Sequence, residues 1–181
     1  MHGLVSLLPQ PYYDKVTSFW ETLEEEFGLM GIWVTPFPHF SWTVFDDCSH
    51  HDLETLMTEI SAQVRPFAIK SSGIGIFSGS SPVVFIPAIK TKELLGIHQE
   101  VWDRFSEIGK GISPYYSPES WNPHISLAYQ DVDGTNIGPT IKWLAAQNTN
   151  WEMTIDNFTY IYEPDGEIGK LRMQFELNEQ T

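Results

Sequence analysis

Two short segments of the chain repeat one order of residue types: proline, histidine, an apolar residue, serine and an apolar residue. The first is residues 38–42 (Pro-His-Phe-Ser-Trp) and the second is residues 123–127 (Pro-His-Ile-Ser-Leu). Successive side chains of a strand point to opposite faces, so a strand would place each histidine beside its serine and turn the apolar residues the other way. Two such strands side by side would line a cleft with two imidazoles and two hydroxyls. That set of groups is suited to phosphate chemistry.

These residue types suggest a division of roles at phosphorus. Displacement at a phosphodiester needs one group that takes a proton from the attacking water or hydroxyl and another that protonates the leaving oxygen. An imidazole with a pKa near ~6.5 can do either near neutral pH, so we expect His39 and His124 to be the acid and the base, in an order that the sequence leaves open. Ser41 and Ser126 would donate hydrogen bonds to the non-bridging oxygens, where negative charge grows. This arrangement requires no metal and no cofactor.

The histidines also admit other interpretations. A single His-x-Ser pair is more often a half-buried strand histidine than a catalytic one, and the repetition in matching contexts favours chemistry. A binding module that keeps the cleft without turnover, and recognises a nucleotide or a phosphorylated metabolite, is the alternative function. A metal site at residues 50–52 (His-His-Asp) is disfavoured because adjacent histidines point apart in a strand and Asp52 suits a helix cap. His2 and His98 receive no role.

Composition and charge restrict the partners. The 181 residues carry a net charge of −14, and their ten Lys and Arg residues are scattered without a cluster. Proteins that grip long duplexes carry a basic stripe, so the substrate expected here is a small nucleotide or an RNA end. The single cysteine, Cys48, gives no disulfide framework and no Cys-based zinc site. No stretch approaches the length of an apolar membrane span, and we expect a cytoplasmic monomer that binds no membrane.

Hydrophobic spacing predicts the elements that carry the motifs. Residues 151–162 and 167–177 alternate like strands around Pro164-Asp165-Gly166, a hairpin signal. Gly73 and Gly75 favour close strand packing or a bulge over a phosphate-binding loop, because no helix follows at once. The remaining expected strands are 3–8, 32–46, 67–77, 82–90 and 123–130, and the expected helices are 12–27, one capped by Asp52 and closed by Pro66, one from Thr91 to Ile108, and 139–147.

The order of these elements indicates a degenerate internal duplication. It runs strand, helix, motif strand, helix and two strands, then helix, motif strand, helix and two strands. No linker-like composition separates the halves. We therefore expect an α+β fold in which residues 1–181 form a single domain of two intertwined, pseudo-symmetric lobes. Each lobe would be a small, mainly antiparallel sheet with helices packed outside, and the motif strands 38–43 and 123–128 would face each other across a central cleft.

Three aromatic residues lie in the loop that leads into the second motif. Tyr115, Tyr116 and Trp121 could stack on a nucleobase. Anchoring of the loop by its aromatic side chains is the alternative.

In these residues, the chain resembles the two-histidine phosphoesterase superfamily, specifically its 2′-5′ RNA ligase-like branch. The family signature is two copies of His-x-Thr/Ser-x on central strands of two pseudo-symmetric lobes. His39 with Ser41, and His124 with Ser126, stand at those positions. Both hydroxyl residues are serine here, where the family often has threonine. The resemblance covers most of the chain, since the runs 73–77, 82–86, 91–108 and 123–127 follow in the family's order.

The resemblance implies a metal-independent phosphodiesterase. Its substrates would be nucleoside 2′,3′-cyclic phosphates, 2′-5′ linkages or RNA ends. No Arg or Lys accompanies either motif in the sequence, which leaves the charge and the size of the substrate open.

Overall fold

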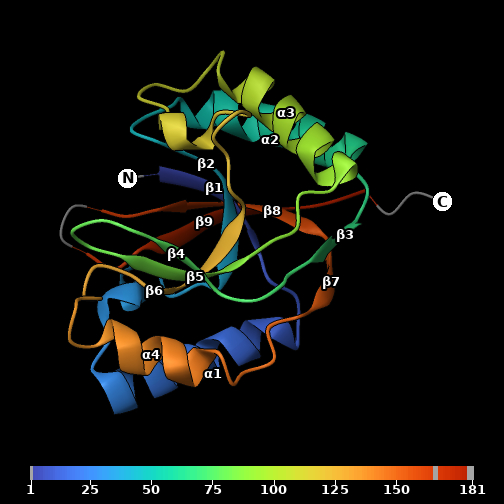
Figure 1. The fold of residues 1–181 in the computed structure, drawn as a ribbon. Coiled ribbons are helices and arrows are strands. Elements are labelled where there is room, and N and C mark those ends of the chain that lie inside the picture. The colour runs from blue at the N-terminus through green and yellow to red at the C-terminus, as the bar shows by residue number, and fades with distance from the viewer. Residues whose placement is uncertain (1, 165–166, 179–181) are drawn as a thin grey trace.

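Over residues 2–164 and 167–178, which the computed structural model describes, the chain forms two lobes of antiparallel sheet with helices on their outer sides (Figure 1). One lobe holds a sheet in the order β2-β1-β8-β9, and the other holds β4-β5-β6 and β3-β7. This arrangement confirms the expected α+β class with two lobes. The bounds are β1 (His2–Leu7), α1 (Tyr12–Phe27), η1 (Gly31–Val34), β2 (His39–Phe45), α2 (His50–Gln63), β3 (Phe67–Lys70), β4 (Gly75–Phe77), β5 (Val83–Pro87), α3 (Lys92–Phe105), η2 (Pro114–Tyr116), β6 (His124–Ala128), α4 (Ile137–Leu144), β7 (Glu152–Ile155), β8 (Asn157–Tyr162) and β9 (Lys170–Glu176).

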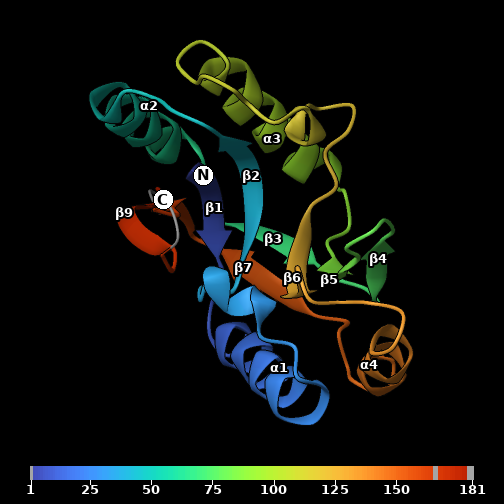
Figure 2. The same cartoon turned by 90° about the vertical axis from the view of Figure 1, so that its left-hand side faces the viewer.

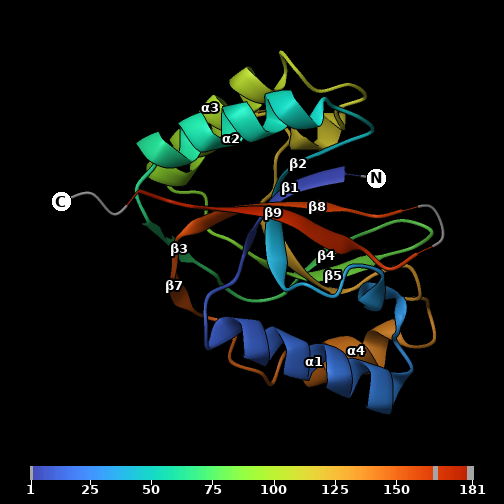
Figure 3. The ribbon, with the colours of Figure 1, turned by 180° about the vertical axis from the view of Figure 1, so that it is seen from behind.

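The two halves of the chain are interleaved across the lobes. Helix α1 contacts β6 of the later half, and α3 contacts β2 of the earlier half. Strand β4 pairs with β5, while β8 returns to pair with β1. Seen from behind, α1 and α4 lie together on one lobe, and α2 and α3 lie together on the other (Figure 3). If the second half is taken to begin at β5, its first helix (α3) packs against the sheet of the first half, and its late strand β8 pairs within that sheet.

The helices follow the expected apolar spacing, with local differences at their ends. Helix α1 covers the expected residues 12–27, and Gly28 ends it with a φ of 70°. Thr91 caps α3 by accepting the Leu94 N–H, as its position indicated, although α3 ends at Phe105 and not at Ile108. The prediction that Asp52 caps α2 is wrong, because Ser49 holds that position and its side chain accepts the N–H of Asp52. Asp52 instead lies in the first turn, where the helix dipole favours a carboxylate.

The run 67–77 forms two strands, where the sequence pattern predicted one. The chain leaves β3 at Lys70 and turns through Gly73, whose φ of 73° lies in the left-handed region that favours glycine. At Gly75 a Cβ would lie 2.4 Å from the Phe85 ring, so this glycine permits close strand packing, as expected. Strands β8 and β9 pair antiparallel, and the turn residues Asp165 and Gly166 lie outside the described residues.

The core begins at the apolar faces of the two motif strands. Phe40 and Trp42 on β2, and Ile125 and Leu127 on β6, are fully buried. The four alternate with the motif histidines and serines, so burying them turns the polar side chains to the opposite faces. Among the described residues, no helix has the length and apolar character needed to cross a bilayer.

Candidate active site

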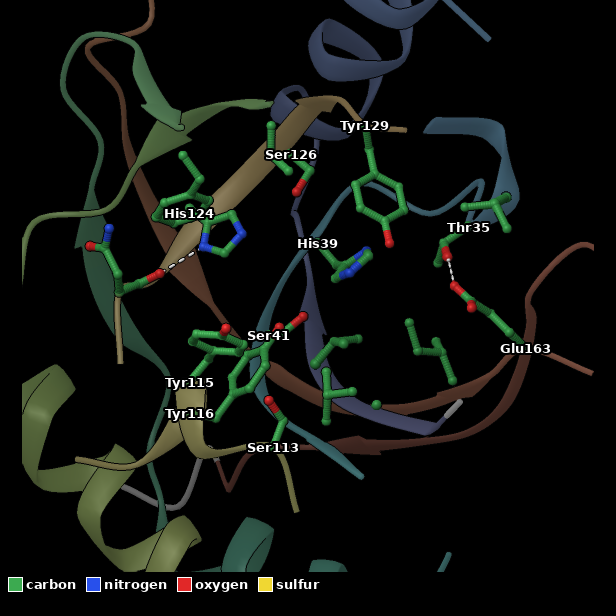
Figure 4. A pocket seen from close by; sticks show the side chains of 18 of the residues that line it. Thr35, His39, Ser41, Ser113, Tyr115, Tyr116, His124, Ser126, Tyr129 and Glu163 are labelled. Carbon is green, nitrogen blue, oxygen red and sulfur yellow. Dashed lines mark hydrogen bonds between the residues drawn. The ribbon is translucent and has the colours of Figure 1, made fainter. Parts of the chain in front are cut away.

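A cavity of about 970 Å³ lies between the lobes, and both motif strands contribute to its wall. His39 and Ser41 line it from β2, and His124 and Ser126 line it from β6 (Figure 4). Strands β2 and β6 lie side by side at the junction of the lobes (Figure 2). The fold therefore brings the four residues singled out in the sequence to one hollow.

Each motif histidine is oriented by a backbone carbonyl two residues before it. The Nδ1 atom of His39 contacts the Phe37 carbonyl oxygen, and the Nδ1 atom of His124 lies 2.6 Å from the Asn122 carbonyl oxygen (Figure 4). A carbonyl can only accept a hydrogen bond, so Nδ1 carries the proton in the neutral ring. This leaves Nε2 as the basic nitrogen of both imidazoles. The two motifs thus match in tautomer as well as in sequence.

Burial makes both imidazoles harder to protonate than an exposed histidine. It lowers the pKa of His39 to about 4; the Phe37 carbonyl opposes this shift and the neighbouring His124 adds to it. The pKa of His124 is also lowered by burial, against the opposing effect of the Asn122 carbonyl. The rings of Phe77 and Phe85 lie with their centroids 4.9 and 5.0 Å from that of His124 and cover part of this half-buried ring. Both rings are therefore neutral near pH 7, and a bound phosphate would favour protonation of one of them.

Two indoles fix the backbone that carries the motif serines. Strands β2 and β6 are both sheet edges, where backbone groups lack a neighbouring strand. Trp121 donates its Nε1–H to the Ser41 carbonyl at 3.0 Å, and Trp20 of α1 donates to the Ser126 carbonyl, also at 3.0 Å. Each motif serine thus has its carbonyl satisfied by an indole N–H.

This position corrects the role expected for Trp121. The side chain is only 1% exposed, and its ring stacks on His98 at 3.8 Å and on Trp42 at 5.6 Å. A buried indole packed in this way offers no platform for a nucleobase. Tyr115 and Tyr116 do line the cavity from η2, and Tyr115 is 80% exposed. All three candidates line the cavity, but Trp121 is almost fully buried, so stacking on a nucleobase stays a prediction for Tyr115 and Tyr116.

Several residues that sequence reasoning missed also line the cavity. Thr35 donates its hydroxyl to a carboxylate oxygen of Glu163 at 2.6 Å, joining segments 128 residues apart. Tyr129 directly follows β6 and turns its ring toward His39 (Figure 4). Its place directly after the second motif strand is the sequence signal that could have pointed to it. Ser113, from a loop without a motif, and Asp46, which directly follows motif strand β2, also line the cavity.

The ends of β6 and α1 are joined near Tyr129. The Asp131 carboxylate accepts the N–H groups of Met30 and Gly31, each at 2.6 Å. A Cβ on Gly31 would lie 2.0 Å from the Tyr129 carbonyl oxygen, so only glycine allows this approach. The contact holds Tyr129 in place from the opposite segment.

Metal ligation finds no support in the arrangement of side chains. Within residues 2–164 and 167–178, no group of three or more His, Cys, Asp or Glu residues could hold a metal ion. His50 and His51 are exposed in the first turn of α2, away from the cavity lining.

Comparison with known proteins identifies the class. The 2′-5′ RNA ligase superfamily matches residues 33–167, a span that contains both motifs. The chain belongs to this superfamily, and with it to the two-histidine phosphoesterases, which are enzymes.

Individual relatives match over nearly the whole chain. A "Putative phosphoesterase" of Bacillus cytotoxicus is 21% identical over 178 residues, which are 97% of this chain and 95% of the relative. The crystal structure of TT0787 from Thermus thermophilus has a TM-score of 0.68 at 17% identity and covers 97% of each chain. Escherichia coli LigT, solved with 3′-AMP, has a TM-score of 0.64 at 14% identity and covers 98% of each chain. At these identities the two structures show a shared fold.

Proposed function

We propose that the chain is a metal-independent phosphodiesterase that acts on nucleoside 2′,3′-cyclic phosphates, 2′-5′ linkages or RNA ends. The observation that carries the proposal is the convergence of two His-x-Ser strands on one cavity, with both imidazoles held through Nδ1 in the same way. Two imidazoles can supply both the acid and the base. The 3′-AMP bound to LigT is a nucleoside monophosphate of the kind that opening a 2′,3′-cyclic phosphate produces, which fits this substrate class.

The proposed reaction is an in-line displacement by water. A neutral imidazole accepts a proton from water at Nε2 as the water oxygen attacks phosphorus. The bond from phosphorus to the leaving ribose oxygen breaks, and the other imidazole, protonated, gives its proton to that oxygen. Ser41 and Ser126 donate hydrogen bonds to the two non-bridging oxygens, where charge increases in the transition state. Both imidazoles present Nε2 as the basic nitrogen, so either one can serve as the base and the other as the acid.

The test is hydrolysis of adenosine 2′,3′-cyclic phosphate in the presence of EDTA. Replacement His39→Ala or His124→Ala should lower kcat by at least ~10²-fold, because each removes one proton-transfer group. His51→Ala is the matched control, since His51 is exposed on α2 and does not line the cavity. Wild-type activity in both cavity variants would refute the assignment.

Binding without turnover is the second candidate, and one observation favours it. Among the described residues that line the cavity none is Lys or Arg, so no permanent cation is in place to stabilise the charge that grows in a transition state. Calorimetry with 3′-AMP separates the candidates. Tight binding, with no turnover of any cyclic or 2′-5′ substrate, would support the binding module.

A further inference from the structure

The hydroxyl of the first motif serine has a phenol beside it. Tyr116 of η2 lies next to Ser41 in the cavity wall, and the two side chains are hydrogen-bonded (Figure 4). Both residues are half-buried and line the cavity. The contact therefore joins a group that is proposed to bind phosphate to a side chain outside the two motifs.

The segment that carries Tyr116 is attached to the strand that carries Ser41. Before η2, the Ser113 N–H donates to the Val44 carbonyl at 2.9 Å, and the Tyr116 N–H donates to the Ser113 carbonyl at 3.1 Å. After η2, the Trp121 Nε1–H donates to the Ser41 carbonyl at 3.0 Å. Tyr116 thus lies between two attachments of its segment to β2, so the fold sets where its phenol lies relative to Ser41.

A bound phosphate would decide the direction of this hydrogen bond. A serine hydroxyl has one proton, which it can rotate toward either neighbour. Non-bridging phosphate oxygens only accept, so the Ser41 proton must point to the ligand, and the Ser41 oxygen can then accept from the Tyr116 phenol. Burial raises the pKa of Tyr116, so the phenol keeps its proton over the pH range in which the buried histidines titrate.

Given the proposed function, we infer that Tyr116 is a positioning residue that donates its phenol O–H to Ser41 and directs the Ser41 proton to a non-bridging phosphate oxygen. Serine has no β-branch to restrict χ1, so without this bond its hydroxyl would sample other rotamers. Donation from the phenol also polarises the Ser41 O–H, which strengthens its bond to phosphate as negative charge grows there. The effect acts through Ser41 and should appear in kcat.

The experiment is a double-variant cycle with adenosine 2′,3′-cyclic phosphate as the substrate and EDTA present. Tyr116→Phe removes the phenol oxygen and keeps the ring, so any stacking on a nucleobase is retained. It should lower kcat by about 3- to 10-fold, in line with the net contribution of one hydrogen bond, and leave KM nearly unchanged. In a Ser41→Ala background the same change should lower kcat no further, because the hydroxyl on which it acts is gone.

Two controls separate this role from a general one. Ser126→Ala removes the equivalent hydroxyl on β6 and leaves Ser41 in place, so Tyr116→Phe should keep its full effect in that background. Tyr12→Phe removes a phenol that donates to the Glu152 carbonyl at 2.7 Å, outside the cavity lining, and should leave kcat unchanged. Denaturant unfolding of Tyr116→Phe should match that of the wild type, because water can reach the half-buried Ser41 hydroxyl from the cavity.

The outcomes distinguish this inference from the proposed function. An equal loss of kcat from Tyr116→Phe in the wild-type and Ser41→Ala backgrounds would overturn the inference alone, because the phenol would then act on another group. An unchanged kcat, with or without a rise in KM, would also overturn it. Failure of the wild-type protein to hydrolyse any cyclic or 2′-5′ substrate would overturn the proposed function and the inference together.

Discussion

The burial of the two histidines predicts an acidic optimum for kcat/KM. The proposed reaction needs one imidazole neutral and the other protonated, and the pH profile of kcat/KM reports the groups of the free enzyme. The pKa of His39 is lowered to about 4, and that of His124 is lowered from the ordinary 6.5. The enzyme with one of these histidines protonated and the other neutral therefore dominates between about pH 4 and a limit below 6.5. A phosphodiester keeps its single charge across this range, so both limbs of the profile belong to the enzyme.

The protonation of the same two histidines sets how far kcat/KM falls at alkaline pH. Above the alkaline limb, the protonated fraction falls tenfold for each pH unit. Between about pH 6.5 and about pH 8.5, kcat/KM should therefore fall by about 50- to 100-fold. Rates measured over this range at constant ionic strength give the limb directly.

Phe77→Ala perturbs the alkaline limb selectively. The Phe77 ring meets that of His124 edge-on at 4.9 Å, so its removal admits water and moves the pKa of His124 back toward the ordinary value. The alkaline limb should move to higher pH. Phe27→Ala is the control, because Phe27 is a half-buried ring on α1 that packs against Trp143. A profile that peaks above pH 7, or a limb that both variants move equally, would refute the reasoning.

Three further predictions concern the residues that support the site. His98 is 1% exposed and burial lowers its pKa to about 4, so the unfolded chain takes up the proton first as pH falls from 6.5. The contribution of His98 to stability is then lost by up to about 3 kcal/mol toward pH 4, and His98→Phe should remove this share of the pH dependence in denaturant titrations, while the share of His39, whose pKa is also lowered to about 4, remains. Trp121→Phe leaves the Ser41 carbonyl without its N–H donor, and should cost about 1–3 kcal/mol in the free energy of unfolding measured with denaturant. Ser41→Ala and Ser126→Ala should each lower kcat by about 10²-fold with little change in thermal stability, and an unchanged kcat would contradict their role as phosphate donors.

Local sequence patterns predicted the elements that hold the motifs. The spacing of Val16, Trp20 and Leu23, with Gly28 after the last turn, is sufficient to give α1 its bounds. The alternation within 38–42 and 123–127 likewise predicted which side chains are buried. Such features depend on residues that are close together in the sequence, so they can be predicted from the sequence alone.

The parts that sequence reasoning missed depend on distant contacts. The exchange of helices between lobes, and the bond between Thr35 and Glu163, exist only once segments far apart in the sequence have packed. Trp121 belongs to this group, because a loop indole can face a ligand or the core, and its stacking on His98 and Trp42 decides the matter. Ser49 and Asp52 were equally suitable caps by type, and the path of the chain into α2 selected Ser49.

The measurement that tests the central claim most directly is kcat on adenosine 2′,3′-cyclic phosphate for His39→Ala, His124→Ala and the double variant. Both imidazoles are proposed to transfer protons in one displacement at one phosphorus, so their effects should not be independent. The account predicts a loss of at least ~10²-fold in each single variant and only a few-fold further loss in the double variant. A double variant whose loss equals the product of the two single losses would contradict it, because the histidines would then act separately.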